Sequence, residues 1–173
     1  MDATSLFTLP GDSRMTIHYI KFSIAICFIS WVVALLANAL LIKTPVYRKL
    51  ENLNFVRSHT VNTLLGMAVI KWIVTKTPFR YFNQSIKLKD KNADLMQIRA
   101  EMTKAEVSHL LGFLFVLCFV IYQGLTVSIG FGLIILVFNI LMNLYPSLLQ
   151  QDNKRRLDRS IKRRQKHRHK SLF

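Results

Sequence analysis

The sequence has few cysteines and no spacing typical of a metal site. Two cysteines occur among its 173 residues, Cys27 and Cys118, and each lies inside an apolar run. We interpret both as small hydrophobic residues, because such placement supports neither a disulfide framework nor a ligand set. None of the five histidines lies at metal-ligand spacing from a cysteine or another strong ligand. We therefore expect no metal and no cofactor.

Several motifs for catalysis or phosphate binding are also absent from the sequence. It contains no G-x-S-x-G nucleophile elbow, no Walker-type phosphate loop and no G-x-G-x-x-G. An H-x-x-x-x-D motif is missing as well, since Leu114 stands five residues after His109 and Leu64 five after His59. These absences disfavour a covalent serine or cysteine mechanism.

Acidic residues are scarce, whereas basic and apolar residues are abundant. Nine Asp and Glu face 24 Lys and Arg, so the formal net charge is +15, and 51% of the chain is hydrophobic. A soluble domain of this size rarely combines these extremes, but a membrane protein with basic cytosolic flanks does so readily. The composition therefore predicts one membrane-embedded domain.

Hydropathy predicts an all-α fold, an integral membrane helical bundle. Apolar runs at about 17–42, 107–122 and 125–149 are each long enough to consider as a span. Only Gln123 and Gly124 separate the last two runs, which indicates a helical hairpin, with close contact at Gly130 and Gly132. Segment 61–76 is apolar but short and contains Lys71, so we expect an interfacial or re-entrant helix there.

Charge predicts the orientation of these spans. Lysines and arginines are concentrated between residues 43 and 104 and in the tail 154–173, whereas the hairpin turn has no charge. The positive-inside rule places both basic segments, and hence the C-terminus, in the cytoplasm. We expect membrane domain 1–153 and a basic tail that contacts anionic lipid headgroups. The tail lacks interleaved aromatic residues, which disfavours nucleic acid as a partner.

Two polar stripes interrupt the apolar pattern. Glu106 and His109 lie three residues apart, so a carboxylate can orient an imidazole on one helix face. Helical spacing also aligns four residues of the last span, Asn139, Asn143, Pro146 and Gln150. Three amides on one stripe are expected to face the bundle interior, and Pro146 is expected to free a carbonyl near Met142 and kink the helix.

Because the hairpin makes the two helices antiparallel, we infer one polar cluster near the cytoplasmic side. It would combine Glu106 and His109 with Asn143 and Gln150. Helix packing alone is the competing interpretation, since asparagines in spans often only join helices, at about 0.6 kcal/mol each.

Three segments resemble a known family. KAEVSH (Lys104 to His109), TPFRYFNQSIK (Thr77 to Lys87) and NLYPSLLQQDNKRR (Asn143 to Arg156) are similar to the pattern of the bacterial glycosyl-4,4'-diaponeurosporenoate acyltransferases, which add the fatty acyl group in staphyloxanthin synthesis. The resemblance covers roughly residues 72–156. Gln151 and Lys154 stand where that pattern has arginine.

The resemblance implies acyl transfer from acyl-CoA or acyl-carrier protein to a hydroxyl of a glycosylated lipid or carotenoid, at the cytoplasmic face of a bacterial cell membrane. His109 would deprotonate the hydroxyl, Glu106 would balance the imidazolium, and Asn143 or Gln150 would donate to the oxyanion. The expected substrate-binding residues are Arg80, Asn139, Asn153, Lys154 and Arg156. Lys154, Arg155 and Arg156 would hold the phosphates of acyl-CoA or the acidic surface of the carrier.

Two other functions remain open. The protein could be a non-catalytic membrane subunit that scaffolds a lipid-synthesis complex, because it is small and has few polar groups within the membrane. It could also be a small transporter or flippase component with the amide stripe along a path, which would require oligomers.

Overall fold

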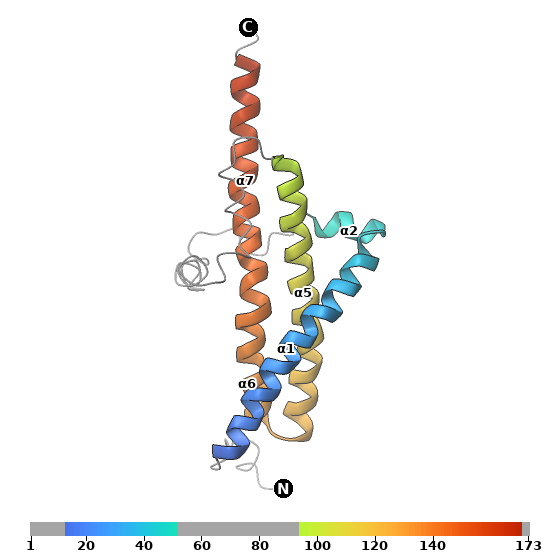
Figure 1. Cartoon of the computed structure of the whole chain (residues 1–173), viewed down its shortest axis with the longest axis vertical. Helices are drawn as coiled ribbons and strands as arrows, with labels where there is room; N and C mark the ends of the chain where they lie inside the picture. Colours follow the sequence, from blue (N-terminus) through green and yellow to red (C-terminus); the bar gives the residue numbers. More distant parts are fainter. Residues whose placement is uncertain (1–12, 52–93, 171–173) are drawn as a thin grey trace. The chain divides into compact units, whose positions relative to one another are not determined.

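The computed structural model describes residues 13–51 and 94–170, with side chains described through residue 165. Six helical segments make up nearly all of these ranges (Figure 1): α1 (Ser13–Leu41), α2 (Pro45–Leu50), α5 (Leu95–Thr126), α6 (Ile129–Asn139), the π-helical turn η4 (Ile140–Leu144) and α7 (Tyr145–Lys170). No strand occurs within these two ranges, and the prediction of an all-α fold is confirmed. The expected interfacial helix at 61–76 lies outside the described residues.

Three helices are long and apolar enough to cross a membrane. They are Ser13–Leu41, Leu95–Thr126 and the uninterrupted helical stretch Ile129–Gln165. These helices correspond to the three apolar runs of the sequence. The chain divides into two compact units, residues 1–47 with 107–147 (unit 1) and residues 48–106 with 148–173 (unit 2).

In unit 1, α1 packs against α6 (Figure 1), and the buried face of α1 carries small side chains. The buried residues of this face lie three or four positions apart and are at most 2% exposed: Ser23, Cys27, Ser30, Ala34 and Asn38. Large apolar residues occupy the opposite face, where Val32, Leu35 and Leu36 are each more than half exposed. Small residues let helices approach closely, and an outward apolar face suits contact with lipid.

The turn between α5 and α6 lies further along the chain than the sequence suggested. Helix α5 continues through Gln123 and Gly124 to Thr126, and Val127 and Ser128 form the turn. The Ser128 hydroxyl accepts a hydrogen bond from the Phe131 amide at 3.1 Å and so caps α6. Gly124 is thus a packing residue of α5.

Gly132 allows a close contact between the backbones of the two helices of this hairpin. A Cβ at Gly132 would lie 2.8 Å from the Val120 carbonyl oxygen and 3.0 Å from the Gly124 Cα. Both obstacles are backbone atoms, which cannot rotate away. The close helix contact predicted at Gly132 is therefore confirmed, with Gly124 as its partner.

An apolar core extends from the hairpin to the first half of α1. Tyr19 stacks on Phe131 with ring centroids 4.0 Å apart, and Phe22 meets the same ring edge-to-face. Ile26, at 6% exposure, and Cys27, Val116 and Ile135, each 0% exposed, complete the buried set. The interpretation of Cys27 as a small hydrophobic residue fits this position, whereas Cys118 is exposed.

The turn η4 ends two residues before Pro146. Proline has no amide hydrogen to donate to the carbonyl four residues earlier, that of Met142. Here the Tyr145 amide bonds to the Ile140 carbonyl, five residues back, which defines the π-helical geometry. The predicted stripe from Asn139 to Gln150 assumed regular α-helical spacing throughout, and η4 changes that spacing within it.

Unit 2 contains the start of α5, α2 after Tyr47, and most of α7. Asp94 caps α5 by accepting from the amides of Met96 and Gln97 at 2.8 and 3.3 Å. A small apolar cluster packs α5 against α7. Its buried members are Ile98, Met102 and Leu157, joined by the partly buried Leu95 and Ile161.

Candidate functional site

Asn143 is the centre of a buried polar group in unit 1, here called the amide cluster (Ser30, Trp31, His109, Asn139 and Asn143). Its carbonyl oxygen Oδ1 accepts from the Trp31 indole at 3.1 Å. Its amide nitrogen donates to the Ser30 hydroxyl at 3.2 Å and to Asn139 Oδ1 at 2.9 Å. A primary amide has two hydrogens to donate, so both are used.

The backbone of α5 contacts this cluster at Gly112 and Phe113. The Asn139 amide donates to the Phe113 carbonyl at 3.0 Å. A Cβ at Gly112 would lie 2.9 Å from Asn143 Oδ1 and 3.3 Å from the Ser30 hydroxyl. Any side chain at position 112 would therefore crowd the Asn143 amide, so glycine is what lets this amide pack against the backbone of α5.

His109 joins the cluster from α5. Its imidazole makes a side-chain hydrogen bond with Asn143 and meets the Trp31 ring edge-to-face, with centroids 6.4 Å apart. Within ranges 13–51 and 94–170, the buried Nδ1 atom has no hydrogen-bond partner. One ring nitrogen is thus held by the protein's own amide, while Nδ1 has capacity left for another group.

The contribution of α1 to this cluster was not predicted from the sequence. Ser30 and Trp31 contact Asn143 directly, and the Asn38 amide donates to the Ser108 hydroxyl at 2.7 Å. Serine and asparagine recurring at helical spacing within an otherwise apolar span are the signal that pointed to them. Because this signal was not used, the first span was predicted only as an apolar membrane span.

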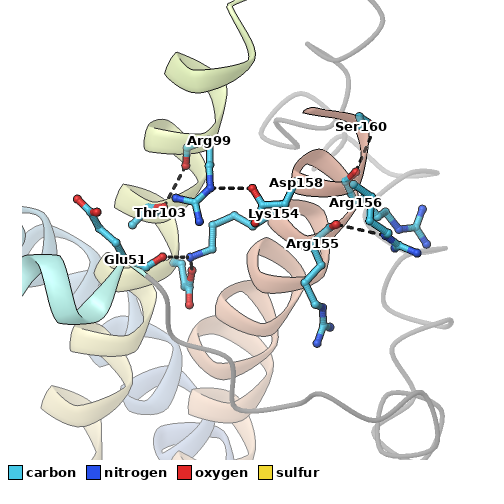
Figure 2. A network of polar contacts seen from close by, with 10 residues as sticks. Glu51, Arg99, Thr103, Lys154, Arg155, Arg156, Asp158 and Ser160 are labelled. Carbon is cyan, nitrogen blue, oxygen red and sulfur yellow. Dashed lines mark hydrogen bonds and ion pairs between the residues drawn. The ribbon is translucent and has the colours of Figure 1, made fainter. Parts of the chain in front are cut away.

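Unit 2 contains a second polar group, here called the ion-pair cluster (Glu51, Arg99, Glu106, Lys154 and Asp158; Figure 2). Lys154 Nζ pairs with Glu106 Oε2 and donates to the Glu51 carbonyl at 2.9 Å. Glu106 is 0% and Lys154 4% exposed, so this is a buried ion pair.

The remaining pair of this cluster lies further along the same two helices. Arg99 Nε meets Asp158 Oδ1 at 2.8 Å, and the Thr103 hydroxyl donates to the Arg99 carbonyl at 3.0 Å (Figure 2). Both Arg99 and Asp158 are partly exposed, at 23% and 40% of their side chains. The two ion pairs fix the register of α5 against α7 on either side of Leu157.

The two positions that depart from the family pattern both contact Glu106. Lys154 forms the ion pair, and the Gln151 side chain lies close enough to the same carboxylate to interact with it electrostatically. The Lys154 ammonium is thus engaged inside the protein, which favours a role in holding α7 over the predicted contact with substrate phosphates. The predicted pairing of Glu106 with His109 stays a prediction.

The other predicted site residues have varied surroundings. Gln150 and Asn153 are buried, at 6% and 3% exposure, and Gln150 Oε1 has no hydrogen-bond partner in the part of the chain that the structure describes. Arg156 is 59% exposed and meets Asp152 at 3.3 Å, so it remains available to solvent. Arg80 lies outside the described residues.

The structure thus brings together three of the predicted residues, His109, Asn139 and Asn143, in unit 1. Glu106 and Lys154 meet in unit 2, to which Gln150 also belongs. A pocket shared by His109, Asn143, Glu106 and Gln150 remains a prediction. Among the described residues, no group of three His, Cys, Asp or Glu side chains is placed to hold a metal ion.

Comparison with known proteins identifies the family. The model of the family described as glycosyl-4,4'-diaponeurosporenoate acyltransferase matches residues 43–163, well over half of the chain. No curated protein and no solved structure gave a significant match. The matched range includes α5, α6, η4 and most of α7 but not α1. The chain therefore belongs to the glycosyl-4,4'-diaponeurosporenoate acyltransferase family.

Proposed function

We propose that the protein is an integral membrane acyltransferase. It moves a fatty acyl group from acyl-CoA or acyl-carrier protein to a hydroxyl of a glycosylated lipid or carotenoid. Family membership and three helices long enough to span a membrane support this proposal. The observation that carries it is His109, an imidazole held by Asn143 whose Nδ1 has no partner among the described residues.

The chemistry assigned to His109 is general base catalysis. The imidazole takes the proton of the acceptor hydroxyl while the hydroxyl oxygen attacks the thioester carbonyl carbon. The carbon–sulfur bond then breaks, and the leaving thiolate takes the proton back from the imidazolium. The products are an ester and a free thiol, so neither a covalent enzyme intermediate nor a metal is needed.

The hydrogen bonds of Asn143 distinguish between two roles for this residue. Both of its amide hydrogens are engaged, by Ser30 and Asn139, so none remains for a developing oxyanion. Asn143 is therefore assigned to hold the imidazole.

The test compares two histidines in purified protein reconstituted into lipid vesicles. Labelled acyl-CoA or acyl-carrier protein is supplied with a glycosylated carotenoid, and acylated product is measured by mass spectrometry. His109→Gln is expected to lower the rate by about 100-fold or more, the usual contribution of a general base. His18→Gln is the matched control, because His18 is exposed near the start of α1.

Two results would count against the proposal. Full activity of inserted, folded His109→Gln would remove His109 from the mechanism. The scaffold interpretation gains support if purified wild-type protein transfers no acyl group from either donor while a deletion strain still lacks an acylated lipid.

The proposal places the protein in a bacterial inner membrane with its C-terminus in the cytoplasm. Single cysteines at two exposed positions, Thr126 in the hairpin and Ser160 in α7, test this in a background without native cysteines. A membrane-impermeant maleimide is expected to label Thr126→Cys in spheroplasts, and Ser160→Cys only after permeabilisation. The reverse pattern would invert the topology.

A further inference from the structure

Trp31 is the side chain of α1 that contacts both parts of the proposed base. Its indole N–H donates to Asn143 Oδ1 at 3.1 Å, and its ring meets the His109 ring at 89°. Trp31 itself is held from outside by Phe28, edge-to-face at 4.8 Å between centroids. Position 31 precedes the range matched by the family model, so the family match does not assign it a role.

The indole N–H is one of three contacts, with Ser30 and Asn139, that orient the Asn143 amide. A primary amide can rotate so that its oxygen and nitrogen exchange places, and only the hydrogen-bond partners choose between the two states. An indole is a donor only. If the amide turned over, its NH₂ group would face the Trp31 N–H, donor against donor, and would lose its bonds to Ser30 and Asn139.

The direction of the amide in turn determines the protonation pattern of the imidazole. An oxygen presented to His109 accepts from a ring N–H, whereas an NH₂ group would require a ring lone pair. When one ring nitrogen carries the proton of that bond, the lone pair lies on the other nitrogen. That lone pair is what a general base needs to accept a proton from a hydroxyl.

We propose that Trp31 is a positioning residue of the His109 centre: its indole N–H holds the oxygen of the Asn143 amide in place and, through that amide, helps to set which ring nitrogen is free to act as the base. This inference rests on the proposed function. Trp31 acts through Asn143 and needs no contact with the acceptor or the acyl donor. Its loss therefore lowers turnover and leaves substrate binding unchanged.

The kinetic test removes the N–H and keeps an aromatic ring. Trp31→Phe is expected to lower kcat about tenfold, the effect of one lost hydrogen bond, with KM for the acyl donor unchanged within about twofold. Asn143→Ala should lower kcat by at least as much. Adding Trp31→Phe to Asn143→Ala should have no further effect, because the two residues act in series. Leu35→Ala, on the exposed face of α1, is the control.

A second measurement does not depend on acyl transfer. Diethyl pyrocarbonate acylates histidine, and mass spectrometry of the detergent-solubilised protein gives the rate at His109 relative to exposed His18. Loss of the Trp31 N–H releases the imidazole from a fixed amide, so Trp31→Phe and Asn143→Ala are each expected to raise that ratio about fivefold. Leu35→Ala should not change it.

The two readouts separate failure of the inference from failure of the proposed function. If wild-type protein transfers no acyl group, the proposed function is rejected. The labelling ratio then still shows whether Trp31 controls the reactivity of His109. Multiplicative kinetic effects of Trp31→Phe and Asn143→Ala overturn the inference, as does a rise in KM without a fall in kcat. An unchanged labelling ratio in folded Trp31→Phe overturns it as well.

Discussion

The ion pair between Lys154 and Glu106 leads to a quantitative prediction about stability. Both groups are almost fully buried, with side-chain exposures of 5% and 0%. Lys154→Met keeps the aliphatic stem but leaves the Glu106 carboxylate without its counter-charge. Two opposite charges about 4 Å apart attract by about 4 kcal/mol at an effective dielectric constant near 20. Breaking a buried pair accordingly costs about 3–5 kcal/mol.

Hydrogen–deuterium exchange measures this loss of stability locally, in the segments that the ion pair joins. The affected amides are those of α5 residues 95–106 and α7 residues 148–165, which belong to unit 2. A loss of 3 kcal/mol corresponds to exchange about 100-fold faster. Adding Glu106→Gln to Lys154→Met should recover most of the protection, because the second change removes the charge that the first one left unpaired.

Arg156→Met provides the matched control, on the same helix and with the same change of charge. Arg156 is 59% exposed and pairs with Asp152 at spacing i,i+4, so its loss should cost about 0.3–0.5 kcal/mol. Exchange in Lys154→Met no faster than in Arg156→Met would refute the reasoning that burial makes the Lys154 pair strong.

Further predictions concern the hairpin of unit 1. Gly132→Ala should strongly destabilise the protein in detergent, because the new methyl group meets the Val120 carbonyl at 2.8 Å; Gly124→Ala should be tolerated, since its nearest neighbour would lie at 3.8 Å. Thermal unfolding followed by circular dichroism compares them, and equal midpoints would contradict the packing described. Ser128→Ala removes the cap on α6 and should lower the free energy of unfolding by about 1 kcal/mol, measured by titration with SDS in mixed micelles; no change would show that the cap contributes nothing.

Much of the candidate site could be predicted because helical spacing is a local property. Residues four apart in an α-helix share a face, so Asn139 and Asn143 were expected to point the same way. Their side chains do hydrogen-bond each other at 2.9 Å. A disturbance of the helix near Met142 was expected from Pro146, and a π-helical turn does occur there, in which the Ile140 carbonyl accepts from the Tyr145 amide five residues later.

The choice of partners could not be predicted in the same way. Glu106 has His109 as an i,i+3 neighbour in the sequence, yet its carboxylate pairs with Lys154, 48 positions later. Trp31 and Asn143 are 112 residues apart. Such pairs depend on how two helices are rotated and shifted against each other, and hydropathy is insensitive to both.

The sequence by itself determined that the chain is helical, apolar in three long stretches, strongly basic and related to acyltransferases of one family. Composition and periodicity suffice for this, because each helix satisfies its own backbone hydrogen bonds and requires no knowledge of its neighbours. Only the tertiary structure decided that α1 reaches Asn143 with an indole and a serine, and that Gly112 makes room for that amide. Contacts between helices depend on side-chain shape and register, which become defined only when the helices pack together.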